Sequence, residues 1–109
     1  KYLLYRFNKD EIDIGLLSYI ADAIIEYIPI IQRIKGFRKI GGKLTEDMGK
    51  YSLVVSGIFR EELGVSKIDY NQYISFGAKC FSNVGNEILA RRMGKVSDLL
   101  YQFNLQKNL

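Results

Sequence analysis

Apolar and small side chains recur every three or four positions along most of this chain, and this period constrains the fold more than any other feature. The repeat is clearest over residues 70–88, where one side of a helix drawn at about 100° per residue collects them. That side holds Tyr70, Tyr73, Ile74, Gly77, Phe81, Val84 and Ile88, and the other holds Gln72, Ser75, Lys79, Asn83 and Asn86. A chain of 109 residues is one domain. We therefore predict an all-α fold over residues 1–109, a compact bundle of three to five helices.

An apolar stretch over residues 12–31 predicts a first helix of unusual composition. One narrow stripe of this helix holds Gly15, Ser18, Asp22 and Glu26, and nearly all other positions are apolar. A helix that is apolar over most of its circumference is surrounded by protein. We therefore expect either the central helix of the bundle or an outer helix that a second subunit covers. Pro29 has no amide proton for the preceding turn, which predicts a kink or a restart there.

Start and stop signals outline the later helices. An acidic pair follows Thr45, and acidic side chains favour the positively polarised start of a helix, so a second helix is expected to begin here. Gly64 is its natural end. Asp69 is predicted to cap a third helix. Gly94 either breaks the helical region or lies inside one long helix, because the apolar spacing continues through it and an interior glycine costs only about 1 kcal/mol.

Small residues recur within two of the predicted helices. They are Gly49, Ser52 and Ser56 in one helix and Gly77, Ala78, Ser82 and Gly85 in the other. Glycine inside a helix lowers its stability, so a compensating contact is expected. Close approach of two helix backbones is the simplest compensation. Gly57 and Arg60 are predicted to lie outside the buried face of their helix.

Two stretches carry a resemblance to other proteins. Residues 49–59 read Gly-Lys-Tyr-Ser-Leu-Val-Val-Ser-Gly-Ile-Phe, and residues 69–77 read Asp-Tyr-Asn-Gln-Tyr-Ile-Ser-Phe-Gly, with Cys80-Phe81 after them. Together with residues 18–22, Ser-Tyr-Ile-Ala-Asp, they resemble a group of small, uncharacterised bacterial helical proteins. The resemblance implies a bacterial helical protein and carries no activity to this chain. Where such sequences often have a proline after the phenylalanine, this chain has Arg60, so the helix can continue there.

The sequence lacks the residues that most enzymes and metal sites use. It contains no histidine and one cysteine, which removes the commonest acid–base group at neutral pH and the commonest metal ligand. Cys80 lies beside the apolar face of its helix, where we expect a buried and inert thiol. A single thiol forms no internal disulfide and fits a reducing compartment, so we expect a cytoplasmic protein. We expect no catalytic residue, no metal and no cofactor.

Asp22 and Glu26 are four positions apart on one helical face. As a functional pair they would hold a divalent cation or share a proton. Such sites normally need further ligands, and the chain has no histidine to supply them. We favour the alternative, in which the two carboxylates form a solvated polar stripe beside an apolar helix.

The chain carries 16 Lys and Arg against 12 Asp and Glu, a net charge of +4. Its most basic segment contains an aromatic side chain, no acidic one, and Arg33, Lys35, Arg38, Lys39 and Lys43. Basic side chains beside an aromatic suit phosphate backbones and base stacking. Binding of nucleic acid or another anionic partner is therefore one alternative. The other is a polar loop, because cations also favour the carboxyl end of a helix.

The first predicted helix is about long enough to cross a bilayer. One uncompensated carboxylate at the centre of a span costs on the order of 3 kcal/mol, however, so we expect a helix buried in protein and no membrane span. The start of the chain shows no secretory signal. Because the chain begins at Lys1, an amino-terminal signal that has already been removed remains an alternative. The apolar first helix and the small-residue helix faces together favour a non-enzymatic interaction or assembly module that forms a homodimer.

Overall fold

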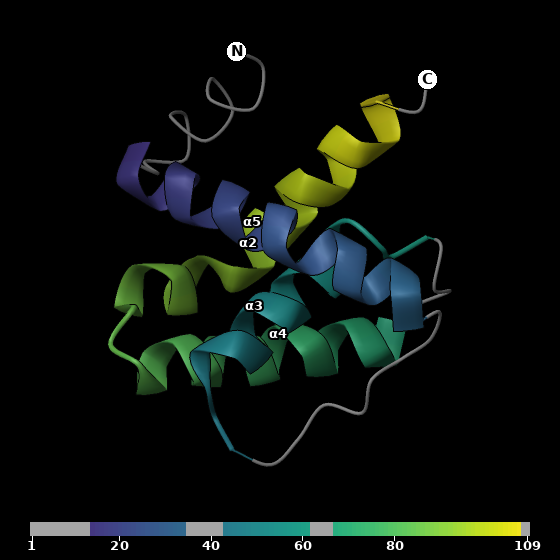
Figure 1. The fold of residues 1–109 in the computed structure, drawn as a ribbon. Coiled ribbons are helices and arrows are strands. Elements are labelled where there is room, and N and C mark those ends of the chain that lie inside the picture. Colours follow the sequence, from purple (N-terminus) through teal and green to yellow (C-terminus); the bar gives the residue numbers. More distant parts are fainter. Residues whose placement is uncertain (1–13, 35–42, 62–66, 108–109) are drawn as a thin grey trace.

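The computed structural model describes residues 14–34, 43–61 and 67–107. These residues form four helices: α2 (Ile14–Ile34), α3 (Glu46–Gly57), α4 (Lys67–Asn83) and α5 (Glu87–Lys107). No strand occurs within the described ranges. Figure 1 shows α3 enclosed between α2 and α4, and α5 packs against both α3 and α4. The predicted all-α bundle is confirmed.

The central helix is α3 and not the first helix. Every residue over positions 51–57 is buried, and α3 packs against each of the other three helices. Of the two alternatives for the apolar stretch over residues 12–31, the central helix is therefore wrong, and the outer helix covered by a second subunit stays a prediction. The described part of that stretch, α2, is an outer helix that buries one side on α3. Small residues explain why α3 is central and α2 is not, because a helix with small side chains lets three neighbouring helices approach it closely.

Close helix contacts occur at the glycines of α3 and α4. A Cβ atom at Gly49 would lie 3.1 Å from Cys80 Cβ, and one at Gly77 would lie 3.3 Å from Ser52 Cβ. These distances confirm the predicted close approach of α3 and α4. Gly57 belongs to the same system, since a Cβ there would lie 2.8 Å from Leu100 Cβ. The prediction that Gly57 lies outside the buried face is wrong, because α5 covers it.

A tight turn separates α4 from α5 and interrupts the periodic segment over residues 70–88. Gly85 has φ 85°, a left-handed conformation that glycine adopts without a Cβ penalty. The next residue, Asn86, accepts a hydrogen bond from the amide of Leu89 at 3.2 Å, as an N-cap does. Val84 and Ile88 are consequently 44% and 46% exposed. Their predicted place on one buried helix face is wrong.

The remaining helix boundaries follow the local signals in part. Thr45 caps α3, since its hydroxyl accepts a hydrogen bond from the Met48 amide at 3.2 Å. The helix ends at Gly57 and not at Gly64 or beyond Arg60. α4 begins at Lys67, so Asp69 lies in its first turn and is not its cap.

The helices test the predictions made at Gly94 and at Pro29. α5 continues through Gly94, which confirms the alternative of one long helix there. Its buried line consists of Leu89, Met93, Val96 and Leu100. α2 likewise contains Pro29 and ends at Ile34, so the helix does not restart at the proline.

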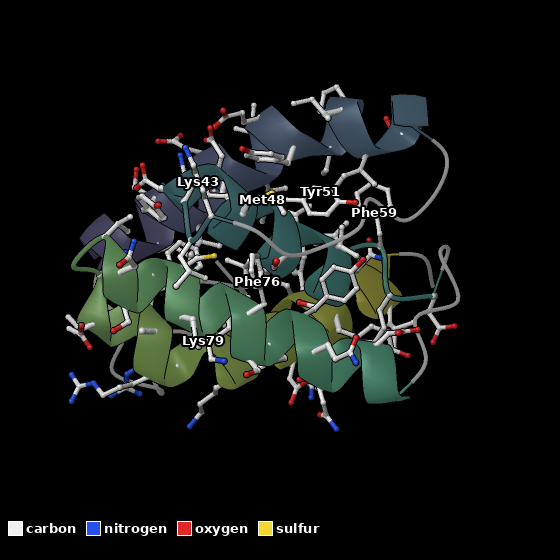
Figure 2. All side chains as sticks on the ribbon, turned by 90° about the horizontal axis from the view of Figure 1, so that it is seen from below. Lys43, Met48, Tyr51, Phe59, Phe76 and Lys79 are labelled. Atoms are coloured by element: carbon white, nitrogen blue, oxygen red, sulfur yellow. The ribbon has the colours of Figure 1, made fainter. Side chains whose placement is uncertain are left out.

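The core consists of two hydrophobic clusters that meet at α3. The first contains Ile20, Leu53, Phe81, Leu89, Met93, Val96 and Leu100. The second contains Tyr27, Ile31, Tyr51, Val54, Val55, Phe59 and Tyr73. Figure 2 shows Tyr51 and Phe59 between α2 and α4. Cys80 is also fully buried, as predicted, and burial raises the pKa of its thiol.

Candidate functional site

The most unusual surface of the described chain is the side of α2 that points away from α3, which we call the outer face of α2. Its exposed residues are Ile14, Gly15, Ser18, Ala21, Asp22, Ile25, Glu26, Pro29 and Gln32. Ile14 is 71% exposed and Ile25 is 73% exposed. Fully burying an isoleucine is worth roughly 1.5–3 kcal/mol, so two such side chains in water represent a large unused contribution to association.

The opposite side of α2 is firmly packed. Ile20 and Ala23 are fully buried, and Tyr27 and Ile31 are nearly so. A helix that buried only this side would be expected to carry polar residues on the other. The outer face has polar residues at Ser18, Asp22, Glu26 and Gln32. Ile14 and Ile25 lie among them and are not buried by the packing of α2 on α3.

Polar contacts fix α2 on the start of α3. Lys50 Nζ lies 3.6 Å from Glu26 Oε2 and 5.2 Å from the centroid of the Tyr19 ring. The Tyr19 hydroxyl donates to Glu46 Oε2 at 2.5 Å. Burial and this carboxylate raise the pKa of Tyr19 well above its ordinary value. These contacts hold one side of α2 against the start of α3.

The carboxylates predicted as a polar stripe lie on the outer face. Asp22 and Glu26 are both exposed, and Glu26 is engaged by Lys50. No group of three or more His, Cys, Asp or Glu side chains that could hold a metal ion occurs in the part of the chain that the structure describes. The geometry of the described residues thus does not bring further ligands to this pair.

Of the helices described, α2 is also the one that is long and apolar enough to cross a membrane, over Ile14–Gln32. Only 22% of this window is buried inside the protein. Length and composition alone make α2 a candidate membrane span. The buried fraction separates α2 from an ordinary core helix and agrees with the exposure of Ile14 and Ile25.

The predicted basic segment is mostly outside the described residues. Lys35, Arg38 and Lys39 lie in the undescribed range 35–42, and the side chain of Arg33 is likewise outside the description. Lys43 is exposed and lies at the surface just before α3 (Figure 2). The structure therefore does not test whether these residues form one basic surface.

A polar cluster that the sequence did not predict surrounds Arg60, in the turn after α3. The Arg60 guanidinium carbon lies 4.3 Å from the centroid of the Tyr70 ring and 4.1 Å from that of Tyr101. Its Nη2 atom lies 3.0 Å from Asp98 Oδ1. Arginine suits this place because its flat faces stack on aromatic rings while its edge donates hydrogen bonds.

The edge of the guanidinium is bonded to α3 and α5. Arg60 Nε donates to the Ser56 carbonyl at 2.7 Å, and Nη2 donates to Ser97 Oγ at 3.2 Å. The Ser97 hydroxyl in turn donates to Ser56 Oγ at 2.8 Å. The Tyr70 hydroxyl donates to Asp98 Oδ1 at 2.7 Å. We call these residues, with Tyr101, the Arg60 cluster.

The Arg60 cluster connects α3, α4 and α5. Burial and the hydrogen bond to Asp98 raise the pKa of Tyr70. The Arg60 charge is compensated by Asp98. The sequence does not predict the cluster, because the helical period places Arg60 outside the buried face of its helix. The available signal was the spacing of Asp98 and Tyr101, which share one face of a helix.

Comparison of this chain with known protein families, with curated proteins and with solved structures finds no match.

Proposed function

We propose that this protein is a non-enzymatic assembly module that associates with a second copy of itself through the outer face of α2. The observation that carries the proposal is the exposure of Ile14 and Ile25, at 71% and 73%, on a helix whose other side is fully packed. Apolar side chains gathered on an exposed surface are typical of interaction sites.

The chemistry of the described residues supports a binding function over a catalytic one. Cys80 is buried and its pKa is raised, which lowers the thiolate fraction that nucleophilic attack needs. Asp98 is shared by Arg60 and Tyr70. The chain offers no histidine to act as a general base.

Sedimentation velocity over a range of concentrations tests the proposal. We expect the wild-type protein to show a rising weight-average mass, and Ile25→Lys to weaken self-association at least about tenfold because two copies of the side chain leave the interface. Ile88→Lys is the matched control, since Ile88 is an exposed isoleucine of α5. A monomer at every concentration, or equal effects of the two variants, contradicts the proposal.

A second candidate function is binding of nucleic acid through Arg33, Lys35, Arg38, Lys39 and Lys43. The exposure of Lys43 and the net charge of +4 support it. Binding of short DNA or RNA should then weaken steeply as salt concentration rises. The double variant Arg38→Ala/Lys39→Ala should lose this binding while keeping the self-association of the wild type. Absence of binding at low salt excludes this function.

A further inference from the structure

The turn between α4 and α5 leaves two apolar side chains in water. Val84 is 44% exposed and Ile88 is 46% exposed. Figure 1 shows this turn at one edge of the bundle. We call Val84 and Ile88 the hairpin tip. Single exposed apolar side chains are ordinary on a protein surface, so the charge around the tip decides what it can contact.

Positive charge gathers in the part of the hairpin that carries this tip. Residues 75–95 contain four Lys or Arg and one Asp or Glu, so this segment supplies +3 of the net charge of +4. We call the four cations the basic collar; they are Lys79, Arg91, Arg92 and Lys95. Arg92 is half-buried, and the other three are exposed. The one carboxylate, Glu87, accepts a hydrogen bond from the Ser82 hydroxyl at 3.0 Å.

On α5, apolar and basic side chains share the exposed face. Arg91 follows Ile88 by three positions, and Lys95 follows Arg91 by four, a spacing that keeps all three on one side of a helix. Leu89 and Met93, which are buried, lie on the other side. One half of the tip and most of the collar therefore lie on one face of α5.

α4 adds Lys79 at the same level. The two helices run antiparallel from the turn (Figure 1), and a Cβ at Gly77 would lie 3.2 Å from Met93 Sδ. Lys79 and Arg91 are each two positions nearer the turn than this contact, so their backbones lie at one level. Figure 2 shows Lys79 on the side of α4 that points away from α2. The collar thus spans both helices of the hairpin.

A surface that presents apolar and basic side chains together fits the interface of an anionic lipid bilayer. Anionic headgroups attract Lys and Arg, and the acyl boundary beneath them receives apolar side chains. A nucleic acid would engage the collar through its phosphates but would leave the tip in water. Long Lys and Arg stems let the charges reach the headgroups while the tip is buried. Charge complementarity and the exposed tip therefore favour a lipid surface.

We propose that the α4–α5 hairpin docks on membranes that contain anionic lipid, with the hairpin tip in the interface and the basic collar at the headgroups. The contact is with one leaflet and is not a span. It involves neither the outer face of α2 nor self-association. Two apolar side chains and four cations give weak and reversible binding, since even a single myristoyl chain binds membranes only marginally.

Co-sedimentation with lipid vesicles tests this inference. We expect the wild-type protein to bind vesicles of phosphatidylcholine and phosphatidylserine in equal amounts, less so as the salt concentration rises, and to bind pure phosphatidylcholine at least about tenfold more weakly. Arg91→Ala/Lys95→Ala should weaken binding at least about tenfold, because each cation near an anionic membrane contributes about fivefold. Arg91→Lys/Lys95→Arg is the matched control and should bind as the wild type does, because the attraction depends on charge.

Ile88→Ser tests the tip and should weaken vesicle binding about fivefold. Leu105→Ser is its control, since Leu105 is 40% exposed on α5 but lies roughly 25 Å further along the helix. Equal binding to both kinds of vesicle, or no loss in the double alanine variant, would overturn the inference. Binding of short duplex DNA that depends on Arg91 and Lys95, with anionic vesicles left unbound, would also overturn it, because the partner would then be a nucleic acid.

Discussion

Arg60 Nη2 and Asp98 Oδ1 lie 3.0 Å apart and join the turn after α3 to the middle of α5. Asp98 Oδ1 also accepts the hydroxyl proton of Tyr70 on α4. One carboxylate oxygen thus ties three helices to a single cation, whose side chain is 19% exposed. The stacking of Arg60 on two tyrosine rings shields its guanidinium, but the Asp98 side chain is 55% exposed. The ion pair is therefore partly solvated, and the ring contacts supply much of what Arg60 contributes.

Replacing Arg60 tests how much this cluster contributes to the stability of the fold. Arg60→Ala removes two cation–π contacts and the ion pair, and it leaves the Ser97 hydroxyl with one partner fewer. We expect a loss of about 2 kcal/mol in the free energy of unfolding, measured by urea titration. Arg91→Ala, at an exposed position on α5, should change stability by less than about 0.5 kcal/mol. Equal and small effects of both variants would mean that the cluster contributes nothing.

Two glycines should respond in opposite directions to the same substitution. Gly57→Ala places a Cβ 2.8 Å from Leu100 Cβ and 3.2 Å from the Ser97 carbonyl oxygen, and overpacking of this kind costs about 1–3 kcal/mol. Gly94→Ala meets only Ile74 Cγ2, at 3.7 Å, so the gain in helix propensity of up to about 1 kcal/mol should dominate. Thermal unfolding of the two variants measures whether each substitution lowers or raises stability. A stabilising Gly57→Ala would contradict the close packing of α3 on α5.

High pH should unfold the protein through its tyrosines. Burial is the main cause of the raised pKa values of Tyr19, Tyr70 and Tyr73. The folded chain therefore holds these protons more tightly than the unfolded chain, whose tyrosines titrate near pH 10. The stability that results is fully present below about pH 10 and is lost as the pH rises above it.

Tyrosinate absorbance and far-ultraviolet circular dichroism, recorded in one alkaline titration, check this expectation. We expect part of the tyrosinate signal to appear together with the loss of helix, well above the pH of the same titration in concentrated urea. If all eight tyrosines ionised near pH 10 with the helices intact, the buried hydroxyl contacts would be wrong.

The helical period predicted the fold class because it records which side chains share a face, and a face must be buried whatever covers it. The period does not report which helix lies at the centre. α2 has the more apolar sequence, yet α3 is enclosed because its small residues admit neighbours on every side. Centrality depends on the sizes of facing side chains on different helices, and Gly57 against Leu100 is a pairing that no local pattern contains.

Local turn chemistry overrode the period at one place. The spacing of apolar residues continues from Phe81 to Ile88 without interruption, but Gly85 and Asn86 stop one helix and start the next. The cap at Asn86 and the left-handed glycine each stabilise the turn by a few tenths to about 1 kcal/mol, which is enough to decide where a helix ends. The Arg60 cluster was equally out of reach, because its residues come from three separate helices.

Nuclear magnetic resonance spectra recorded over a dilution series test the central claim, that the outer face of α2 is an interaction surface for a second copy. The account predicts concentration-dependent shifts at the amides and methyl groups of Ile14, Ser18, Ala21 and Ile25, with the Arg60 cluster unchanged. Spectra that stay the same up to millimolar concentration, or shifts confined to Val84 and Ile88, would contradict it.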